Sequence, residues 1–225
     1  DDAEASNQAK DRFLAIISHE LRTPLTPVLA ITATLLNGPQ PPQPQREDFE
    51  MIQRNIELEA RLIDDLLDLT RISRDKLHLT LETLALEPLI TRTLTICQAD
   101  ITGKQLQVET DLSATECFVR GDHARLQQIL WNLIKNAVKF TPQQGFLKIW
   151  AEPAPDRRVL VHVRDTGIGI PPETLPRIFT PFDQGGANTA KTYGGLGLGL
   201  AISKALAELQ DGILTAHSAG RNVSE

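Results

Sequence analysis

Residues 159–170 have the sequence VLVHVRDTGIGI, the most informative stretch of the chain. The apolar, β-branched run at 159–163 predicts a strand. Asp165, Gly167 and Gly169 follow directly, which predicts a tight turn at the edge of a pocket. A buried carboxylate there can accept a hydrogen bond from the amino group of adenine and would repel the carbonyl oxygen of guanine. The stretch therefore predicts a site that selects ATP.

A predicted helix at about residues 122–140 precedes this stretch. Asn132 and Asn136 are four positions apart and Lys139 follows three later, so we expect the three side chains on one helix face. Amide oxygens are hard ligands that suit Mg²⁺, and a lysine ammonium suits a phosphate. The helix is a candidate platform for Mg²⁺ and a triphosphate, although a solvated helix surface explains the same residues taken alone.

A glycine-rich run precedes another predicted helix, which ends near Leu209. Gly195, Gly197 and Gly199 alternate with leucine, and backbone N–H groups at a helix start can bind phosphates. A flexible linker explains this run equally well in isolation. The run lacks the Lys-Ser/Thr of a P-loop, and it comes too late in the chain for a Rossmann loop.

Two other enzyme classes fit poorly. Neither the His-Arg-Asp nor the Asp-Phe-Gly motif of Ser/Thr/Tyr protein kinases occurs in the chain. The triplet at residues 165–167, Asp-Thr-Gly, also matches aspartic proteases. Those enzymes need two such carboxylates sharing a proton, which here would require a dimer axis at this strand.

The N-terminal third has a helical pattern. Apolar residues recur at helical spacing over residues 7–36 and again over 46–73. Pro24 and Pro27 predict a bend in the first helix, and the proline-rich run at 37–44 predicts the tip of a hairpin. The second helix carries more apolar surface than two helices can bury, so we expect two hairpins to form a four-helix bundle, that is, a homodimer. A hairpin folded back on its own chain is the alternative.

Five motifs in this order resemble those of sensor histidine kinases of the HisKA type. They are the H box at residues 13–25, the N box at 132–139, the first glycine box at 165–169, the F box at 179–182 and the second glycine box at 195–199.

The resemblance implies an α+β chain. Residues 1–76 would form the helical hairpin of a dimeric four-helix bundle, and residues 83–225 an α/β two-layer sandwich, the Bergerat-type ATP-binding fold. Residues 77–81 and 212–216 look like further strands, and we expect the strand with which this family closes its sheet to be missing after Glu225.

The resemblance also assigns roles in the H box. It implies that His19 is the phosphoacceptor, whose neutral imidazole attacks the γ-phosphoryl group of ATP. Glu20 would polarise the imidazole N–H. Thr23 lies four positions after His19, on the same helix face, and resembles the residue that positions water when such a kinase dephosphorylates its partner.

In the ATP-binding boxes, the resemblance implies that Asn136 binds Mg²⁺ with Asn132 beside it. It places Lys139 on phosphate and Asp165 on adenine. Lys191 lies in a small, polar segment that resembles the ATP lid, from which it would reach the phosphates.

Composition is consistent with this assignment. The 225 residues are 41% hydrophobic and 23% charged, which is typical of a globular protein. A net charge of −6 without a basic run argues against binding to nucleic acid or to an anionic membrane. Cys97 and Cys117 form no disulfide or zinc pattern. We expect a cytoplasmic segment, which a missing N-terminal part could anchor to a membrane.

The predicted function is ATP-dependent autophosphorylation of His19, followed by phosphoryl transfer to an aspartate of a response regulator. The expected cofactors are ATP and Mg²⁺. The expected partners are a second copy of the chain, a receiver domain and an upstream sensor module outside this chain. A non-catalytic phosphotransfer or scaffold module, and a protein that is mainly a phosphatase of its response regulator, are the alternatives.

Overall fold

The computed structural model describes residues 23, 26–28, 30–31, 46–72, 77–112, 117–183 and 196–220. The chain divides into two compact units, Asp1–Lys76 and Leu77–Glu225. In the first unit, α2 (Arg46–Ile72) matches the second predicted helix. No helix within these described ranges has both the length and the apolar run that a membrane span needs.

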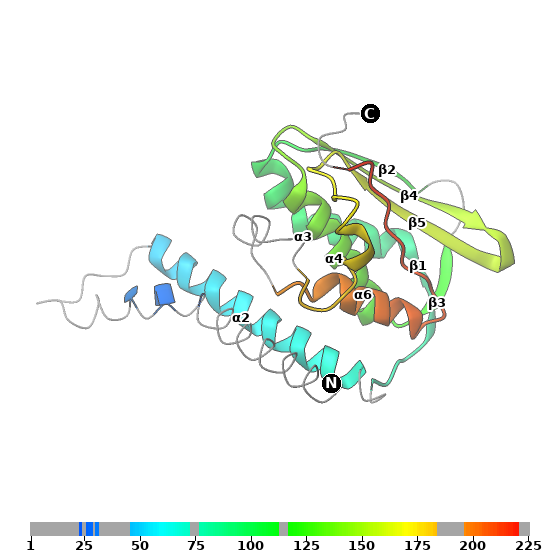
Figure 1. Ribbon diagram of the computed structural model, residues 1–225, viewed down its shortest axis with the longest axis horizontal. Helices are drawn as coiled ribbons and strands as arrows, with labels where there is room; N and C mark the ends of the chain where they lie inside the picture. Colours follow the sequence, from blue (N-terminus) through cyan, green and yellow to red (C-terminus); the bar gives the residue numbers. More distant parts are fainter. Residues whose placement is uncertain are drawn as a thin grey trace, which may run out of the picture. The chain divides into compact units, whose positions relative to one another are not determined.

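The second unit combines helices with short strands (Figure 1). Its described helices are α3 (Leu86–Gly103), α4 (His123–Phe140) and α6 (Gly199–Glu208), and two short 3₁₀ turns occur at Pro155–Arg157 and Leu175–Arg177. Its described strands are β1 (Glu82–Ala85), β2 (Gln107–Asp111), β3 (Phe118–Gly121), β4 (Phe146–Ala154) and β5 (Arg158–Asp165). This mixture confirms the predicted α+β class.

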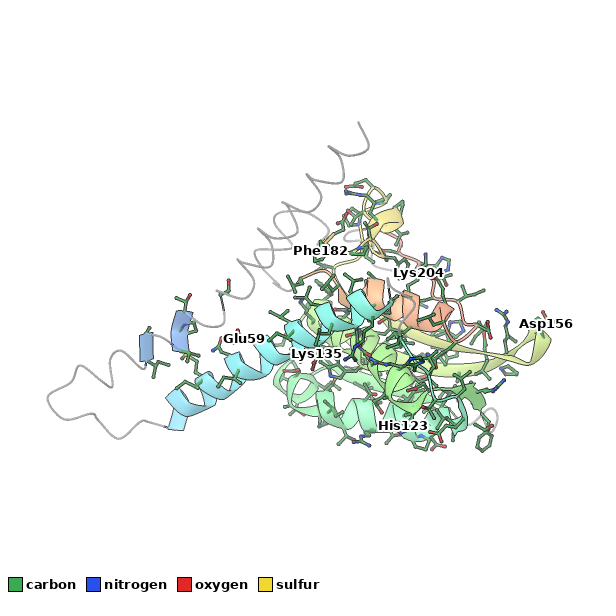
Figure 2. All side chains as sticks on the ribbon, turned by 90° about the horizontal axis from the view of Figure 1, so that it is seen from below. Glu59, His123, Lys135, Asp156, Phe182 and Lys204 are labelled. Atoms are coloured by element: carbon green, nitrogen blue, oxygen red, sulfur yellow. The ribbon has the colours of Figure 1, made fainter. Side chains whose placement is uncertain are left out.

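The strands form two small sheets. In one, β1 pairs antiparallel with β3. In the other the order is β2–β4–β5, where β2 runs parallel and β5 antiparallel to β4. Val108 of β2 lies opposite Leu147 of β4, and Ile149 of β4 lies opposite Val163 of β5. The hairpin between β4 and β5 has Asp156 at its tip (Figure 2).

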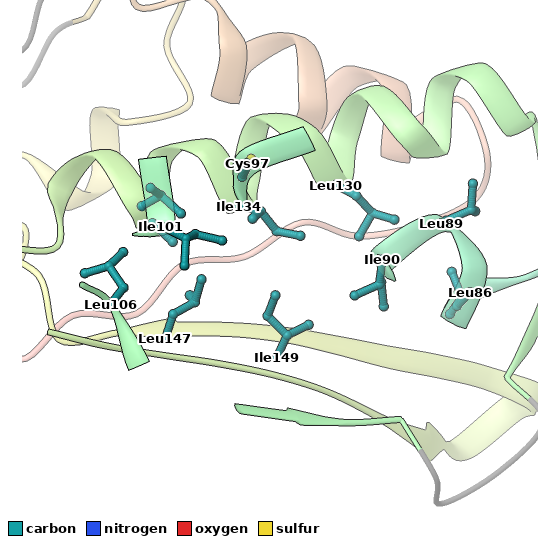
Figure 3. Close-up of a cluster of buried hydrophobic side chains, with 12 residues drawn as sticks. Leu86, Leu89, Ile90, Cys97, Ile101, Leu106, Leu130, Ile134, Leu147 and Ile149 are labelled. Carbon is teal, nitrogen blue, oxygen red and sulfur yellow. The ribbon is translucent and has the colours of Figure 1, made fainter. Parts of the chain in front are cut away.

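An apolar core joins α3 and α4 to the sheet that contains β4 (Figure 3). Leu147 and Ile149 alternate along β4 with more exposed residues and are completely buried, as expected for one face of a strand. Ile134 of α4 and Ile90 of α3 are also completely buried in this cluster. The core therefore fixes one face of α4 and leaves its other side for the site.

The start of α4 was predicted correctly, and Asp122 is its N-cap. Its carboxylate accepts a hydrogen bond from Arg125 N at 3.1 Å, which satisfies a donor of the first turn. Desolvation works against the charged carboxylate, but hydrogen bonds from the backbone of Thr80 and Arg125 hold the pKa of Asp122 below its ordinary value.

Two predicted strands were wrong. Residues 77–81 lie in no strand, and Thr80 N donates instead to the Asp122 carboxylate at 2.8 Å. Residues 212–216 also lie in no strand, although their burial alternates along the chain. Alternating burial shows an extended backbone, but it does not supply the hydrogen-bonded neighbour that defines a strand.

Replacing Ile134 with alanine tests the core. The substitution leaves a cavity between α4 and β4, so we expect the free energy of unfolding in urea to fall by about 2–5 kcal/mol. Ile96→Ala is the matched control, because Ile96 is 56% exposed on α3. A fall for Ile134→Ala no larger than that of the control would contradict the core assignment.

Candidate functional site

The N box joins α4 to the start of α6. Asn132 is buried, and its Nδ2 donates to Gly199 O at 3.2 Å and to Ser203 Oγ at 3.0 Å. These contacts bring the N box and the second glycine box together, as the sequence predicted for a shared site. Because both amide protons are used inside the protein, only Oδ1 of Asn132 could reach a cation.

Asn136 and Lys139 lie in the last turns of the same helix. Both are half-buried. The Lys139 ammonium lies 5.1 Å from the centroid of the Phe140 ring. The amide of Asn136 and the ammonium of Lys139 therefore both lie near the C-terminal end of α4. A magnesium-bound phosphate requires these two kinds of group.

The first glycine box packs against this end of α4. Ile168 N donates to Phe140 O at 3.3 Å. A side chain at position 167 would collide with Asp165 Oδ1 and would place its Cβ 2.9 Å from Phe140 O, so only glycine allows this close approach. Gly169 has φ of 68°, a conformation that glycine adopts without strain.

Asp165 stands at the end of β5 with a constrained carboxyl group. Its Oδ1 accepts a hydrogen bond from Gly167 N at 2.8 Å, which restrains the orientation of the carboxylate. The residue as a whole is accessible, yet protein atoms crowd the carboxyl group. This desolvation outweighs the hydrogen bond from Gly167 and raises the pKa of Asp165 above its ordinary value.

The F box meets the second glycine box through backbone contacts. Phe182 N donates to Gly197 O at 3.1 Å. Gly197 has φ of 69°, and a Cβ there would lie 2.7 Å from Asp183 O, so position 197 requires glycine. The N, first glycine, F and second glycine boxes thus converge around α4 and α6.

Three contacts at this place were not predicted. Lys204 Nζ of α6 lies 5.2 Å from the centroid of the Phe179 ring, and Arg177 pairs with Asp183 at 3.2 Å. Ser218 Oγ accepts a hydrogen bond from Ile170 N at 2.8 Å, which fastens the loop after the first glycine box. The contacts of Lys204 and Ser218 join residues 25 and 48 positions apart, so no local spacing in the sequence indicates them.

Of the remaining predicted site residues, the structure describes only Thr23. Thr23 is helical and exposed in the first unit. His19, Glu20, Lys191 and Gly195 lie outside the described residues.

Possible metal ligands and cavities restrict where a ligand could bind. In the ranges that the structure describes, no group of three or more His, Cys, Asp or Glu side chains could hold a metal ion. A cavity of about 110 Å³ is lined by Leu86, Cys117 and Ala151, among others, away from the boxes. It is smaller than the roughly 300 Å³ at which ligand pockets begin. The boxes themselves remain the candidate site.

Comparison with known proteins first defines the class. Residues 121–223 match the family of histidine kinase-, DNA gyrase B- and HSP90-like ATPases. Residues 9–75 match the His Kinase A (phospho-acceptor) domain. The second unit therefore contains an ATP-binding domain, and the first contains a phospho-acceptor domain.

Individual relatives place the chain in a narrower group. It is 43% identical over 216 residues to the circadian input-output histidine kinase CikA of Synechococcus elongatus, covering 93% of this chain and 28% of that protein. The histidine kinase AdeS of Acinetobacter baumannii superposes with a TM-score of 0.71 at 27% identity, covering 90% of this chain and 92% of that one. The histidine kinase ThkA, in complex with the response regulator protein TrrA, shares the fold with a TM-score of 0.66 at 22% identity, covering 93% of this chain and 57% of that one.

The chain thus belongs to the sensor histidine kinases of two-component systems. It spans between 26% and 31% of the length of the first curated relatives that it matches.

Asp165→Asn tests the adenine side of the site. The asparagine can still accept from Gly167 N, but it turns an N–H₂ donor toward the adenine amino group. We expect the affinity for a non-hydrolysable ATP analogue, measured by calorimetry, to fall by about ten-fold or more, as for the loss of a hydrogen bond to a charged group. Asp156→Asn at the distant hairpin tip is the matched control and should bind as the wild type does (Figure 2).

The same variant has a distinctive stability. Since the folded state raises the pKa of Asp165, the ionised carboxylate destabilises the fold at neutral pH, and protonation at low pH removes that penalty. Without nucleotide, Asp165→Asn should therefore melt no lower than the wild type at pH 7, and any advantage should shrink as the pH falls. A lower melting temperature at pH 7 together with unchanged affinity would contradict the assignment.

Proposed function

We propose that this chain is the catalytic core of a sensor histidine kinase that autophosphorylates on His19 and passes the phosphoryl group to an aspartate of a response regulator. One observation carries the proposal. Four boxes converge around α4 and α6, in a chain whose residues 9–75 match a phospho-acceptor domain. Such a core would act in the cytoplasm, where ATP and receiver domains are found.

In this proposal Asp165 Oδ2 accepts from the adenine amino group, while Lys139 and the backbone N–H groups at the start of α6 bind phosphates. Magnesium fits the donor set, because amide oxygens of Asn136 and Asn132 are hard ligands and the cation takes its other ligands from phosphate and water. When bound, Mg²⁺ would neutralise phosphate charge and polarise the γ-phosphoryl group. Closure of the segment that contains Lys191 would bring that ammonium to the phosphates.

The chemical step is a nucleophilic displacement. A lone pair of the neutral His19 imidazole forms a bond to the γ-phosphorus, and the bond between that phosphorus and the β,γ-bridging oxygen breaks, so ADP leaves. Glu20 accepts a hydrogen bond from the other ring nitrogen and stabilises the positive charge that develops there. The phosphohistidine then transfers its phosphoryl group to a carboxylate of the receiver domain.

The surface of α2 supports dimerisation, which the HisKA domain implies. Ile56, Ile63 and Leu67 are 54%, 45% and 47% exposed, and their spacing of seven and four places them on one stripe of the helix. Burying such a stripe against a second copy would remove apolar surface from water.

A response regulator is the proposed partner because the solved ThkA structure contains one, and an upstream sensor module is the proposed source of the signal. The non-catalytic scaffold alternative is not favoured, since relatives such as CikA and AdeS are histidine kinases.

Autophosphorylation is tested with His19→Gln and γ-³²P-labelled ATP. The wild type should acquire label that is labile in acid and stable in alkali, and the variant should acquire less than about one hundredth of it, because no other group replaces the nucleophile. His78→Gln, an exposed histidine of the second unit, should label normally. Undiminished labelling of His19→Gln would overturn the proposal.

Thr23→Ala tests the phosphatase role. We expect autophosphorylation within about two-fold of wild type and dephosphorylation of the phosphorylated receiver at least five-fold slower, because only the second reaction needs a positioned water. Thr26→Ala, another exposed threonine of the same helical stretch, is the matched control. The substrate is the receiver domain from the same genome that accepts label fastest. Equal dephosphorylation rates for the two variants would remove Thr23 from this role.

A further inference from the structure

Each carbonyl group at the C-terminal end of α4 accepts a hydrogen bond. The last four carbonyl groups of an α-helix lack partners within the helix. In α4 these belong to residues 137–140. Ala137 O accepts from Thr141 N at 3.0 Å and from Thr141 Oγ1 at 2.6 Å, and Phe140 O accepts from Ile168 N of the first glycine box.

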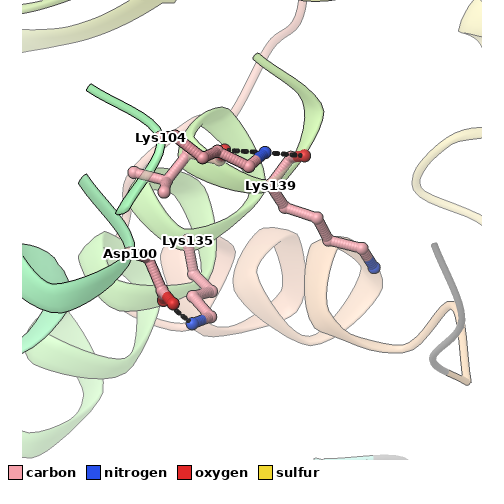
Figure 4. Close-up of polar contacts among 5 residues, drawn as sticks. Asp100, Lys104, Lys135 and Lys139 are labelled. Atoms are coloured by element: carbon pink, nitrogen blue, oxygen red, sulfur yellow. Dashed lines mark hydrogen bonds and ion pairs between the residues drawn. The ribbon is translucent and has the colours of Figure 1, made fainter. Parts of the chain in front are cut away.

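The two carbonyls between them are bound by Lys104, the C-cap residue directly after α3. Its ammonium donates to Lys139 O at 2.7 Å (Figure 4), and also to Val138 O at 2.8 Å and to Thr141 O at 2.9 Å. Lys104 is itself fixed at its backbone, where its N–H donates to Asp100 O at 3.0 Å and its carbonyl accepts from Gln144 N at 2.8 Å. A lysine ammonium has three protons, and all three are used here.

Lys104 and Lys139 therefore have different functions at the same helix end. The Lys139 side chain runs away from Lys104, so its ammonium lies apart from the three bound carbonyls (Figure 4). Lys104 is half-buried and has no proton left for a phosphate. Lys139 is therefore the lysine that can contact the nucleotide directly. Lys104 can affect nucleotide binding only through α4.

The contact of Lys104 with the end of α4 affects nucleotide binding through the charge of the helix end. The C-terminal end of a helix carries a partial negative charge of about half an elementary charge, which repels nearby phosphates. Asn136 and Lys139 lie at this end of α4, and the first glycine box is bonded to it through Phe140 O. A cation placed on the terminal carbonyls offsets the repulsion and also holds the last turn in one position.

We propose that Lys104 is a positioning residue of the nucleotide site, which sets the affinity for phosphates through the end of α4 without touching the nucleotide. This inference rests on the proposed function of the same site.

The test uses the full chain and measures, by calorimetry, the affinity of Lys104→Met for a non-hydrolysable ATP analogue and for ADP. We expect the ATP analogue to bind about ten-fold more weakly, and ADP to lose less because it carries fewer phosphate charges. Lys104→Arg, which keeps the charge and the donors, should recover most of the loss. The matched control is Lys148→Met, because Lys148 of β4 also forms an ion pair between two elements, with Glu109 of β2, but lies outside the boxes.

The outcomes are distinguishable. Circular dichroism at the assay temperature verifies that each variant is folded, and Lys104→Gln, neutral but still a donor, replaces Lys104→Met if that variant does not fold. Affinity within two-fold of wild type in a folded neutral variant, or an equal loss in Lys148→Met, overturns the inference. Failure of the wild type to bind the analogue would instead contradict the proposed function.

Discussion

The carbonyl groups at the end of α4 impose the constraint on which the site depends. They lie beside the core, so each needs a hydrogen-bond donor, and the donors come from three separate parts of the unit. Lys104 contributes from the end of α3, Thr141 from the turn after α4, and Ile168 from the first glycine box. Satisfying one helix end therefore fixes α3, α4 and the loop after β5 relative to one another.

The two sides of α4 explain how a stable core and a polar site share one helix. Ile134 and Val138 face the apolar cluster with Leu147 and Ile149 of β4. Asn132 faces α6, where its amide group holds the backbone at Gly199. The apolar side contributes stability through burial, while the polar side carries the groups that we propose bind nucleotide. Asp165, at the other edge of the site, lowers the stability of the fold when it is ionised, because burial raises its pKa.

The sequence predicted the parts with strong local signals. The period of α4, its start near residue 122 and the run of β5 are all local patterns, and the structure confirms these elements. Helix α3 was not specifically predicted because threonine and isoleucine, which favour strands, are frequent in it. Lys104 gave no signal, since its partners lie more than thirty residues away. His19, Glu20, Lys191 and Gly195 lie outside the described residues and stay predictions.

The most direct measurement is a crystal structure of the chain grown with Mg²⁺ and a non-hydrolysable ATP analogue. We expect the adenine amino group within hydrogen-bond distance of Asp165 Oδ2, with the phosphates beside Asn136 and Lys139 at the end of α4. A nucleotide bound elsewhere on the unit, or an adenine ring turned away from Asp165, would contradict the central claim that these converging boxes form the ATP site.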